Sequence, residues 1–121
     1  MMYLRGKHPF IKLKVKLDLK RWVDLDCLID TGFSGGLAIP EHYKISFPAS
    51  KFIEAQFVLA DGSTVSVDTT TTQVRFNSYE KEIAVVFMGD SDSLVGVEFL
   101  DQMRFCLDLI LNSVELTGNH K

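Results

Sequence analysis

One acidic residue, Asp30, lies in a sequence context that could support hydrolytic chemistry. Thr31 and Gly32 follow it, and the stretch 28–37 places this carboxylate in a glycine-rich turn between two apolar runs. Two carboxylates a few ångströms apart do not both ionise, so one keeps a proton and the pair can act as acid and base on a peptide bond. The motif occurs once in the chain. We therefore expect the second carboxylate to come from a second copy of the chain.

The neighbours of Asp30 suit this geometry. Hydrolysis without a metal requires a water that loses a proton as it attacks and a proton that reaches the leaving nitrogen. Gly32 lets backbone N–H groups approach and orient the carboxylate. The Thr31 hydroxyl can reach across a dimer axis, and Ser34 can hydrogen-bond the outer oxygen of Asp30. The alternative is that Asp30 is a structural turn residue with Thr31 and Gly32 as its turn partners.

Two predicted strands lead the chain to Asp30. Residues 10–17 alternate between apolar side chains and lysines, as a strand with one buried face requires. A polar turn at 18–21 follows, and the run 22–29 predicts a second strand that ends at Asp30. A hairpin should therefore position the carboxylate.

The rest of the chain also indicates a mostly β fold. Asp61-Gly62 between the runs 52–59 and 63–67 is a strong hairpin signal. Its turn, Ala60 to Ser63, is either an ordinary hairpin tip or a flap over a site. Further strands are predicted at 37–40, 69–76, 81–87, 93–96, 105–109 and 114–116, with a helical turn at 41–44 and a short helix at 97–103.

Length and composition limit the possible classes of protein. A chain of 121 residues with 46% hydrophobic content predicts one domain, residues 1–121, without repeats or linkers. The formal charge of −3 does not favour nucleic-acid binding, although the first 21 residues hold seven cations against Asp18. No run is long and apolar enough to span a membrane, and no apolar leader begins the chain. We expect a cytoplasmic protein.

The cysteines and histidines do not form a metal-binding pattern. Cys27 and Cys106 lie far apart in apolar runs, which predicts buried thiols rather than a zinc site or a disulfide framework. His8, His42 and His120 have no neighbouring ligand residues, so we expect surface histidines. No metal or other cofactor is predicted.

Three motifs together resemble the retropepsin-like aspartic proteases, specifically their small single-domain bacterial members. The first motif is Leu28–Ser34, the second is Leu59–Thr64, and the third is Leu94–Leu100, which contains Gly96. Their order is that of the family: acid, flap, glycine motif, closing strand. Phe33 stands where retroviral members usually have alanine. Val97 and Glu98 stand in place of the Arg/Asn-Asp common in viral enzymes.

The resemblance implies a fold and an arrangement of the site. The fold would be a closed, orthogonal β-barrel of the retropepsin type with one short C-terminal helix. Two copies would form a homodimer in which each Asp30 supplies half of the dyad, supported by Thr31, Gly32 and Ser34. A peptide or protein substrate would lie extended beneath two flaps, and Gly96 would pack beneath the site. The flap residues would be Ala60, Asp61, Gly62 and Ser63.

Two functions remain open at this stage. The first is an aspartic endopeptidase. The second is a non-catalytic dimeric module that keeps the groove and binds a peptide or protein without cutting it. In either case we expect the dimer interface to use the terminal segments 3–9 and 114–119, because these would be unpaired strand edges.

Overall fold

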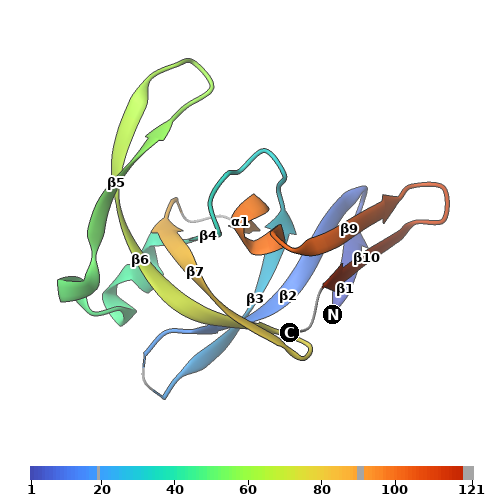
Figure 1. Ribbon diagram of the computed structural model, residues 1–121, viewed down its shortest axis with the longest axis horizontal. Coiled ribbons are helices and arrows are strands. Elements are labelled where there is room, and N and C mark those ends of the chain that lie inside the picture. Colours follow the sequence, from blue (N-terminus) through green and yellow to red (C-terminus); the bar gives the residue numbers. More distant parts are fainter. Residues whose placement is uncertain (19, 90–91, 119–121) are drawn as a thin grey trace.

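The computed structural model describes residues 1–18, 20–89 and 92–118. The described residues are mostly in β-strands, with two 3-10 helices and a single short α-helix (Figure 1). The strands are β1 Met2–Arg5, β2 His8–Lys16, β3 Trp22–Ile29, β4 Leu37–Ile39, β5 Ile53–Val58, β6 Thr64–Phe76, β7 Tyr79–Phe87, β8 Ser93–Val95, β9 Met103–Asp108 and β10 Ser113–Gly118. The helices are η1 Glu41–Ser46, η2 Ala49–Lys51 and α1 Val97–Leu100.

Eight strands form one sheet that curves round on itself. Their order is β1-β2-β3-β8-β4-β7-β6-β5, and an additional pairing of β2 with β6 makes the arrangement ring-like (Figure 1). Strands β9 and β10 form a separate antiparallel pair. The prediction of a mostly β fold with one short α-helix near the C-terminus is confirmed.

Strand β2 follows the alternation in its sequence. Ile11, Leu13 and Val15 are fully buried, whereas Lys12 and Lys14 are exposed on the opposite face. Antiparallel pairing with β3 continues this division, because Leu25 and Cys27 lie on the buried face. The buried face of this hairpin packs into the core inside the ring. The largest side chains of that core with less than 2% exposure are Phe99, Ile11, Leu13, Leu37, Ile39 and Ile83.

The main departure from the predicted strands is the length of β6. Residues 63–67 and 69–76 were expected to form separate strands, but residues 64–76 form one continuous strand of 13 residues. Asp68 does not turn the chain: it stays paired with Glu54 of β5, and its carboxylate also forms an ion pair with Lys44 of η1, N to O 2.9 Å. The strand changes partner instead: it pairs with β5 up to Thr69 and with β7 from Thr69 onward.

Two boundaries near the termini also differ from expectation. The predicted helix at 97–103 ends at Leu100, since Gln102 adopts a positive φ of 67° and Met103 already begins β9. Within segment 3–9, strand β1 pairs with β2 on one side and is the first strand of the sheet, so its other edge has no strand partner among the described residues. Gly6, with φ of 62°, allows a tight turn that pairs β1 with β2. Of the segment 114–119, residue 119 lies outside the described residues.

Cys106 is exposed, so the prediction of a buried thiol is wrong at this position and correct at Cys27. The reason is the small sheet β9–β10, which packs only one face against the core. Met103 and Phe105 lie on the packed face, and Cys106 lies on the other.

The His8 and His42 side chains are exposed as expected, whereas residue 120 lies outside the described part. Among the described residues, none of the helices has the length and apolar character needed to cross a membrane.

Candidate active site

Asp30 lies at the carboxyl end of β3, where this strand runs parallel to β8. The pairing aligns Leu28 with Leu94 and Ile29 with Val95. The ladder then extends by one bond, because the Asp30 N–H donates to the Val95 carbonyl at 2.9 Å. The backbone of the acid is thus fixed by the sheet, while its side chain belongs to the loop that follows.

A tight turn orients the Asp30 carboxylate. The Gly32 N–H donates to Asp30 Oδ1 at 2.9 Å, and the Phe33 N–H donates to the Asp30 carbonyl at 3.1 Å. A Cβ at position 32 would lie 3.2 Å from Oδ1, which is tighter than an ordinary contact. The predicted role of Gly32, close approach of the backbone to the carboxylate, agrees with this geometry.

The glycine motif around Gly96 is hydrogen-bonded to the loop that carries Asp30. Three N–H groups of the motif, those of Gly96, Val97 and Glu98, donate to loop carbonyls at 2.9–3.1 Å; their acceptors are the carbonyls of Gly36, Phe33 and Gly35, respectively. A Cβ on Gly96 would lie 2.3 Å from the Phe33 oxygen and 2.4 Å from the Gly35 oxygen. A side chain at position 96 would therefore displace the loop that carries Asp30.

The Phe33 ring folds back onto its own loop. It occupies the space above two glycines, because a Cβ at Gly35 or at Gly96 would meet ring atoms at 2.7 Å. The ring is half-buried. Phe33 thus packs on a platform that exists only because positions 35 and 96 lack side chains, which explains how this loop accepts a phenylalanine.

Glu98 is a supporting residue that we did not predict. Its Oε1 accepts a hydrogen bond from the Ala84 N–H of β7 at 2.9 Å. The same oxygen would lie 3.0 Å from a Cβ at Gly36. Glu98 therefore joins α1, β7 and the Asp30 loop. In the sequence, Glu98 is an acidic residue in the first turn after the glycine motif. Its position is one at which this motif differs from that of the viral enzymes.

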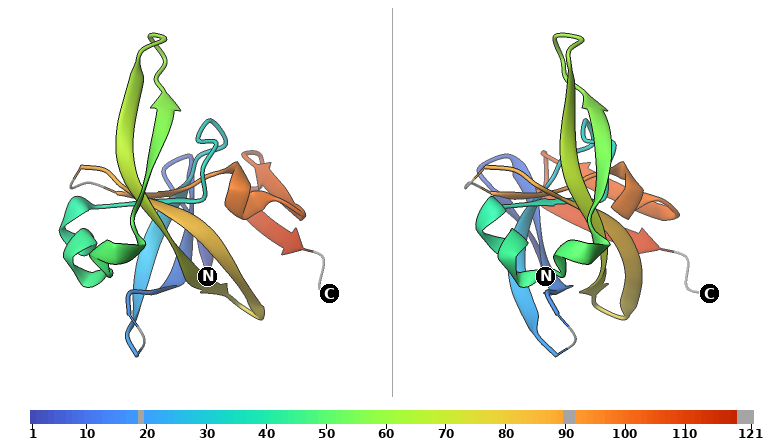
Figure 2. Two further views of the ribbon diagram at one scale, coloured as in Figure 1. Left: turned by 60° about the vertical axis from the view of Figure 1, so that its left-hand side comes forward. Right: turned by 90° about the vertical axis from the view of Figure 1, so that its left-hand side faces the viewer.

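The predicted flap is a hairpin of β5 and β6. Its turn is closed by bonds from the Leu59 N–H to the Ser63 carbonyl, 2.8 Å, and from the Gly62 N–H to the Leu59 carbonyl, 2.9 Å. Gly62 has φ of 86°, a conformation that favours glycine. All four predicted flap residues, Ala60 to Ser63, are exposed. The hairpin projects from the ring on the same side as the loop after β3 (Figure 2).

The flap tip carries an ionised carboxylate. Asp61 Oδ1 accepts bonds from Ser63 Oγ at 2.6 Å and from the Ser63 N–H at 2.8 Å. These two donors lower the pKa of Asp61 below its usual value, the hydroxyl having the larger effect. The tip therefore holds a negative charge even in mildly acidic solution.

Thr31 and Ser34 are brought near Asp30 by the loop but do not bond to it. Both side chains are exposed, and neither hydroxyl forms a hydrogen bond within the described residues. The bond expected from Ser34 to the outer Asp30 oxygen is not formed in the single chain. The described residues also hold no cluster of three or more potential metal ligands.

Comparison with known proteins supports the fold. No protein-family model matches the chain, and no curated protein sequence matches it. Among solved structures, the chain is similar to the crystal structure of a retropepsin-like aspartic protease from Rickettsia conorii, with a TM-score of 0.65 and 19% sequence identity. The similarity covers 97% of this chain and 88% of that one. At this identity the likeness shows a shared retropepsin-like fold.

Proposed function

We propose that the chain is an aspartic endopeptidase that acts as a homodimer, with one Asp30 from each copy. The observation that carries this proposal is the geometry of the Asp30 loop. Its carboxylate is oriented by the Gly32 amide, braced by the motif around Gly96, and placed on the same side of the fold as a flap hairpin. A structural turn residue would not need this bracing from a distant segment.

The chemistry follows from two carboxylates that share one proton. The ionised carboxylate removes a proton from a water as the water attacks the scissile carbonyl carbon, and the protonated one donates to the carbonyl oxygen. Collapse of the tetrahedral intermediate then transfers a proton to the leaving nitrogen and breaks the C–N bond. A single copy has one Asp30, so only the dimer can perform both proton transfers.

The flap offers a way to hold the substrate. Strand β5 is the last strand of the sheet, so one of its edges has no partner in the described chain. An extended peptide can add backbone hydrogen bonds to such an edge. Substrate held this way would lie between the flap and the Asp30 loop, and the Thr31 and Ser34 hydroxyls remain free for the partner copy.

The dimer surface we propose includes the terminal strands. Strand β1 lies against β10, which brings the first and last described strands together. The turn between β9 and β10 adds three exposed apolar side chains, Leu109, Ile110 and Leu111, with exposures of 49%, 91% and 74%. An apolar cluster of this kind is typical of surfaces that a partner covers. An isologous two-fold contact would bury it on both copies.

The test is cleavage of an unstructured peptide library between pH 3 and pH 8. The proteins compared are the wild type, Asp30→Asn, and Asp24→Asn as a matched control, since Asp24 is an exposed acid of the same strand paired with Lys14. Sedimentation measures the oligomeric state of each. We expect wild type and Asp24→Asn to cut, and Asp30→Asn to remain dimeric and lose cleavage. If all three dimerise and none cuts, the protein is a peptide-binding module; if Asp30→Asn cuts normally, Asp30 is not the catalytic acid.

A further inference from the structure

A cavity of about 620 Å³ lies away from Asp30, at the base of the flap strands. It is bounded by the end of β2, the turn that leads to β3, the segment that contains η1 and η2, and the middle of β6. None of the residues assigned to the candidate active site lines it. Its volume is in the range of sites that hold small organic molecules.

The inner wall of this cavity combines apolar side chains with hydroxyl groups. Leu17 and Phe47 belong to the buried core and also line the cavity. Thr70 and Thr72 lie on the face of β6 that continues with the buried residue Val74. These two positions therefore carry hydroxyls where the alternation of the strand calls for apolar side chains.

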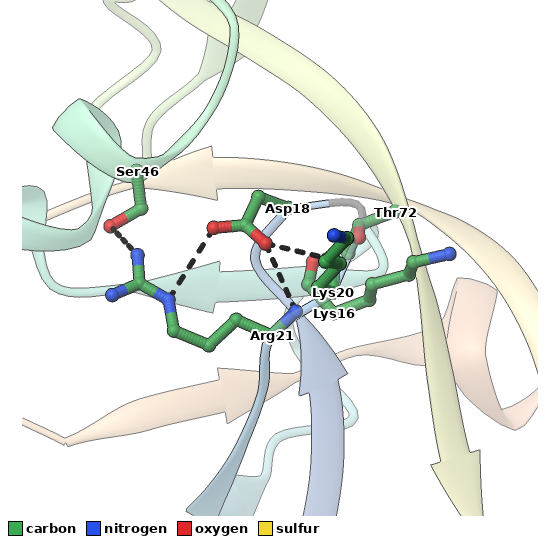
Figure 3. Close-up of polar contacts among 6 residues, drawn as sticks. All are labelled: Lys16, Asp18, Lys20, Arg21, Ser46 and Thr72. Carbon is green, nitrogen blue, oxygen red and sulfur yellow. Dashed lines mark hydrogen bonds and ion pairs between the residues drawn. The ribbon is translucent and has the colours of Figure 1, made fainter.

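The two threonines differ in their partners. The Thr72 hydroxyl donates to the Lys16 carbonyl and so helps to join β6 to β2 (Figure 3). Thr70 is only 5% exposed, lines the cavity, and its hydroxyl makes no hydrogen bond within the described residues. Since none of the fully buried side-chain polar atoms of the described residues lacks a partner, this unbonded hydroxyl is accessible to solvent from the cavity. The cavity is the place from which such a partner can come.

The rim of the cavity carries an excess of positive charge. Lys16, Lys20 and Lys51 line it, and none of them forms an ion pair among the described residues. The acids in the lining are Asp18 and Glu82.

Asp18 is already engaged by its own turn. It accepts the Lys20 N–H at 3.0 Å and the Arg21 N–H at 2.9 Å, and the Arg21 guanidinium, held in turn by Ser46, lies 3.5 Å from its second oxygen (Figure 3). The Lys16 ammonium lies 5.9 Å from the centre of the Trp22 ring, which is outside the lining, so Lys20 and Lys51 are the lysines left to balance the uncommitted carboxylate of Glu82.

We propose that this cavity binds a small organic anion with an apolar body. The body would pack against Leu17, Phe47 and Pro48, the anionic group would lie among the lysines, and an oxygen of the ligand would accept a hydrogen bond from Thr70. A ligand with these three features satisfies the apolar wall, the excess charge and the unpartnered hydroxyl together. The site is independent of the chemistry proposed for Asp30.

The experiment uses three probes with the same apolar body: 2-naphthoate, 2-naphthyl phosphate and the neutral 2-naphthalenemethanol. Binding to the labelled full-length protein is followed by NMR. We expect shift changes at Leu17, Thr70 and Thr72, with either anion binding about tenfold more tightly than the alcohol at low salt, because a hydrogen bond that involves a charged group is stronger than a neutral one. Added salt should reduce this difference. Comparison of the two anions tells whether carboxylate or phosphate is preferred.

Substitutions test whether binding depends on the Thr70 hydroxyl and the lysine charges or on apolar contact alone. Thr70→Val keeps the β-branched shape and removes the hydroxyl, and K20Q combined with K51Q removes two charges. Both should weaken binding of the preferred anion several-fold, whereas Lys7→Gln, an exposed lysine outside the cavity, should not change it. The proposal fails if the alcohol binds as well as the anions, if the shift changes lie elsewhere, or if no probe binds. It also fails if Lys7→Gln weakens binding as much as the cavity variants do.

Discussion

The Asp30 carboxylate owes its orientation to a single backbone amide. The Gly32 N–H bonds Oδ1, and no other hydrogen bond reaches this carboxylate within the described residues. Oδ2 is therefore available for a water or for a group of the partner copy. A catalytic carboxylate needs this freedom, because one oxygen must exchange a proton while the other stays fixed.

Replacing Ser63 by alanine should raise the pKa of Asp61. The Ser63 hydroxyl is the largest of the influences that lower this pKa, and its loss leaves only the backbone donor. The carboxyl would then begin to protonate at a higher pH than in the wild type. An NMR titration of the Asp61 carboxyl carbon measures the change, and Ser66→Ala, an exposed serine further along β6, is the control. An unchanged titration would show that the hydroxyl bond does not persist in solution.

The two cysteines should differ sharply in reactivity. Burial raises the pKa of the Cys27 thiol to about 12, so at pH 8 it stays protonated and inaccessible. Cys106 is exposed. Iodoacetamide at pH 8 should therefore label one thiol in the folded protein and two in denaturant, as counted by mass spectrometry. Peptide mapping should place the first label on Cys106, and a first label on Cys27 would contradict the buried position of this residue.

Among the structural elements, the glycine motif after β8 has the tightest steric requirement. It supplies three N–H donors to the Asp30 loop and leaves no room for a Cβ at Gly96. Its backbone conformation is not the cause, because Gly96 has an ordinary φ of −112°. The requirement is one of space alone.

Gly96→Ala should therefore reduce cleavage more than its effect on folding would suggest. Forcing a methyl group into this space costs about 1–3 kcal/mol of unfolding free energy. Misplacing a catalytic group by an ångström can reduce the rate by about a hundredfold. Denaturant unfolding and peptide cleavage are measured side by side.

The matched control is Gly89→Ala, which has free space around it but a φ of 62°. Its strain costs about 1–2 kcal/mol, a similar loss of stability, and should leave cleavage by the folded protein unchanged. Equal effects of the two substitutions on cleavage would contradict a specific role for Gly96.

The elements differ in how far the sequence alone could predict them. The alternation in β2 and the Asp61-Gly62 turn are local signals, and both gave the observed structure. The continuity of β6 goes with its pairing to both β5 and β7 and with the Asp68 contact to Lys44, 24 residues away, and no local pattern contains these tertiary contacts. At the candidate site, the motif predicted the turn after Asp30 and the close approach at Gly32, and both are observed, whereas the catalytic role of Asp30 stays a prediction. The Glu98 bond to β7 was not, because it requires the tertiary fold.

At the scale of the whole molecule, the two regions for which we propose functions are separate. The flap and the Asp30 loop project from one side, whereas the lysine-lined cavity lies at the base of the flap strands. The small sheet β9–β10 extends outward and ends in the apolar turn that we assign to the dimer surface. Activity should therefore depend on contacts far from Asp30 along the chain.

Ile110→Asp should weaken the dimer and reduce cleavage in parallel. Ile110 is 91% exposed in the single chain, so the substitution should leave the fold intact while placing a charge in an apolar contact. Cleavage should recover as protein concentration rises, since association follows mass action. Ile45→Asp is the control, because Ile45 is 88% exposed but lies on η1. If sedimentation shows that both variants lose the dimer, or that neither does, the turn between β9 and β10 is not part of the interface.

The change of partner along β6 has a mechanical consequence. Up to Thr69 the strand pairs with β5, and from Thr69 it pairs with β7. Near this change of partner, Asp68 forms its ion pair with Lys44, and the Thr69 hydroxyl donates to the Ile53 carbonyl at 2.9 Å. The hairpin is therefore anchored to the rest of the sheet near Thr69. Its 13-residue strand β6, about 43 Å long when extended, continues without interruption from the projecting hairpin into the wall of the cavity. Any movement of the hairpin tip must therefore occur by bending of β6. A contact that stiffens β6 near Thr69 also limits how far the tip can move.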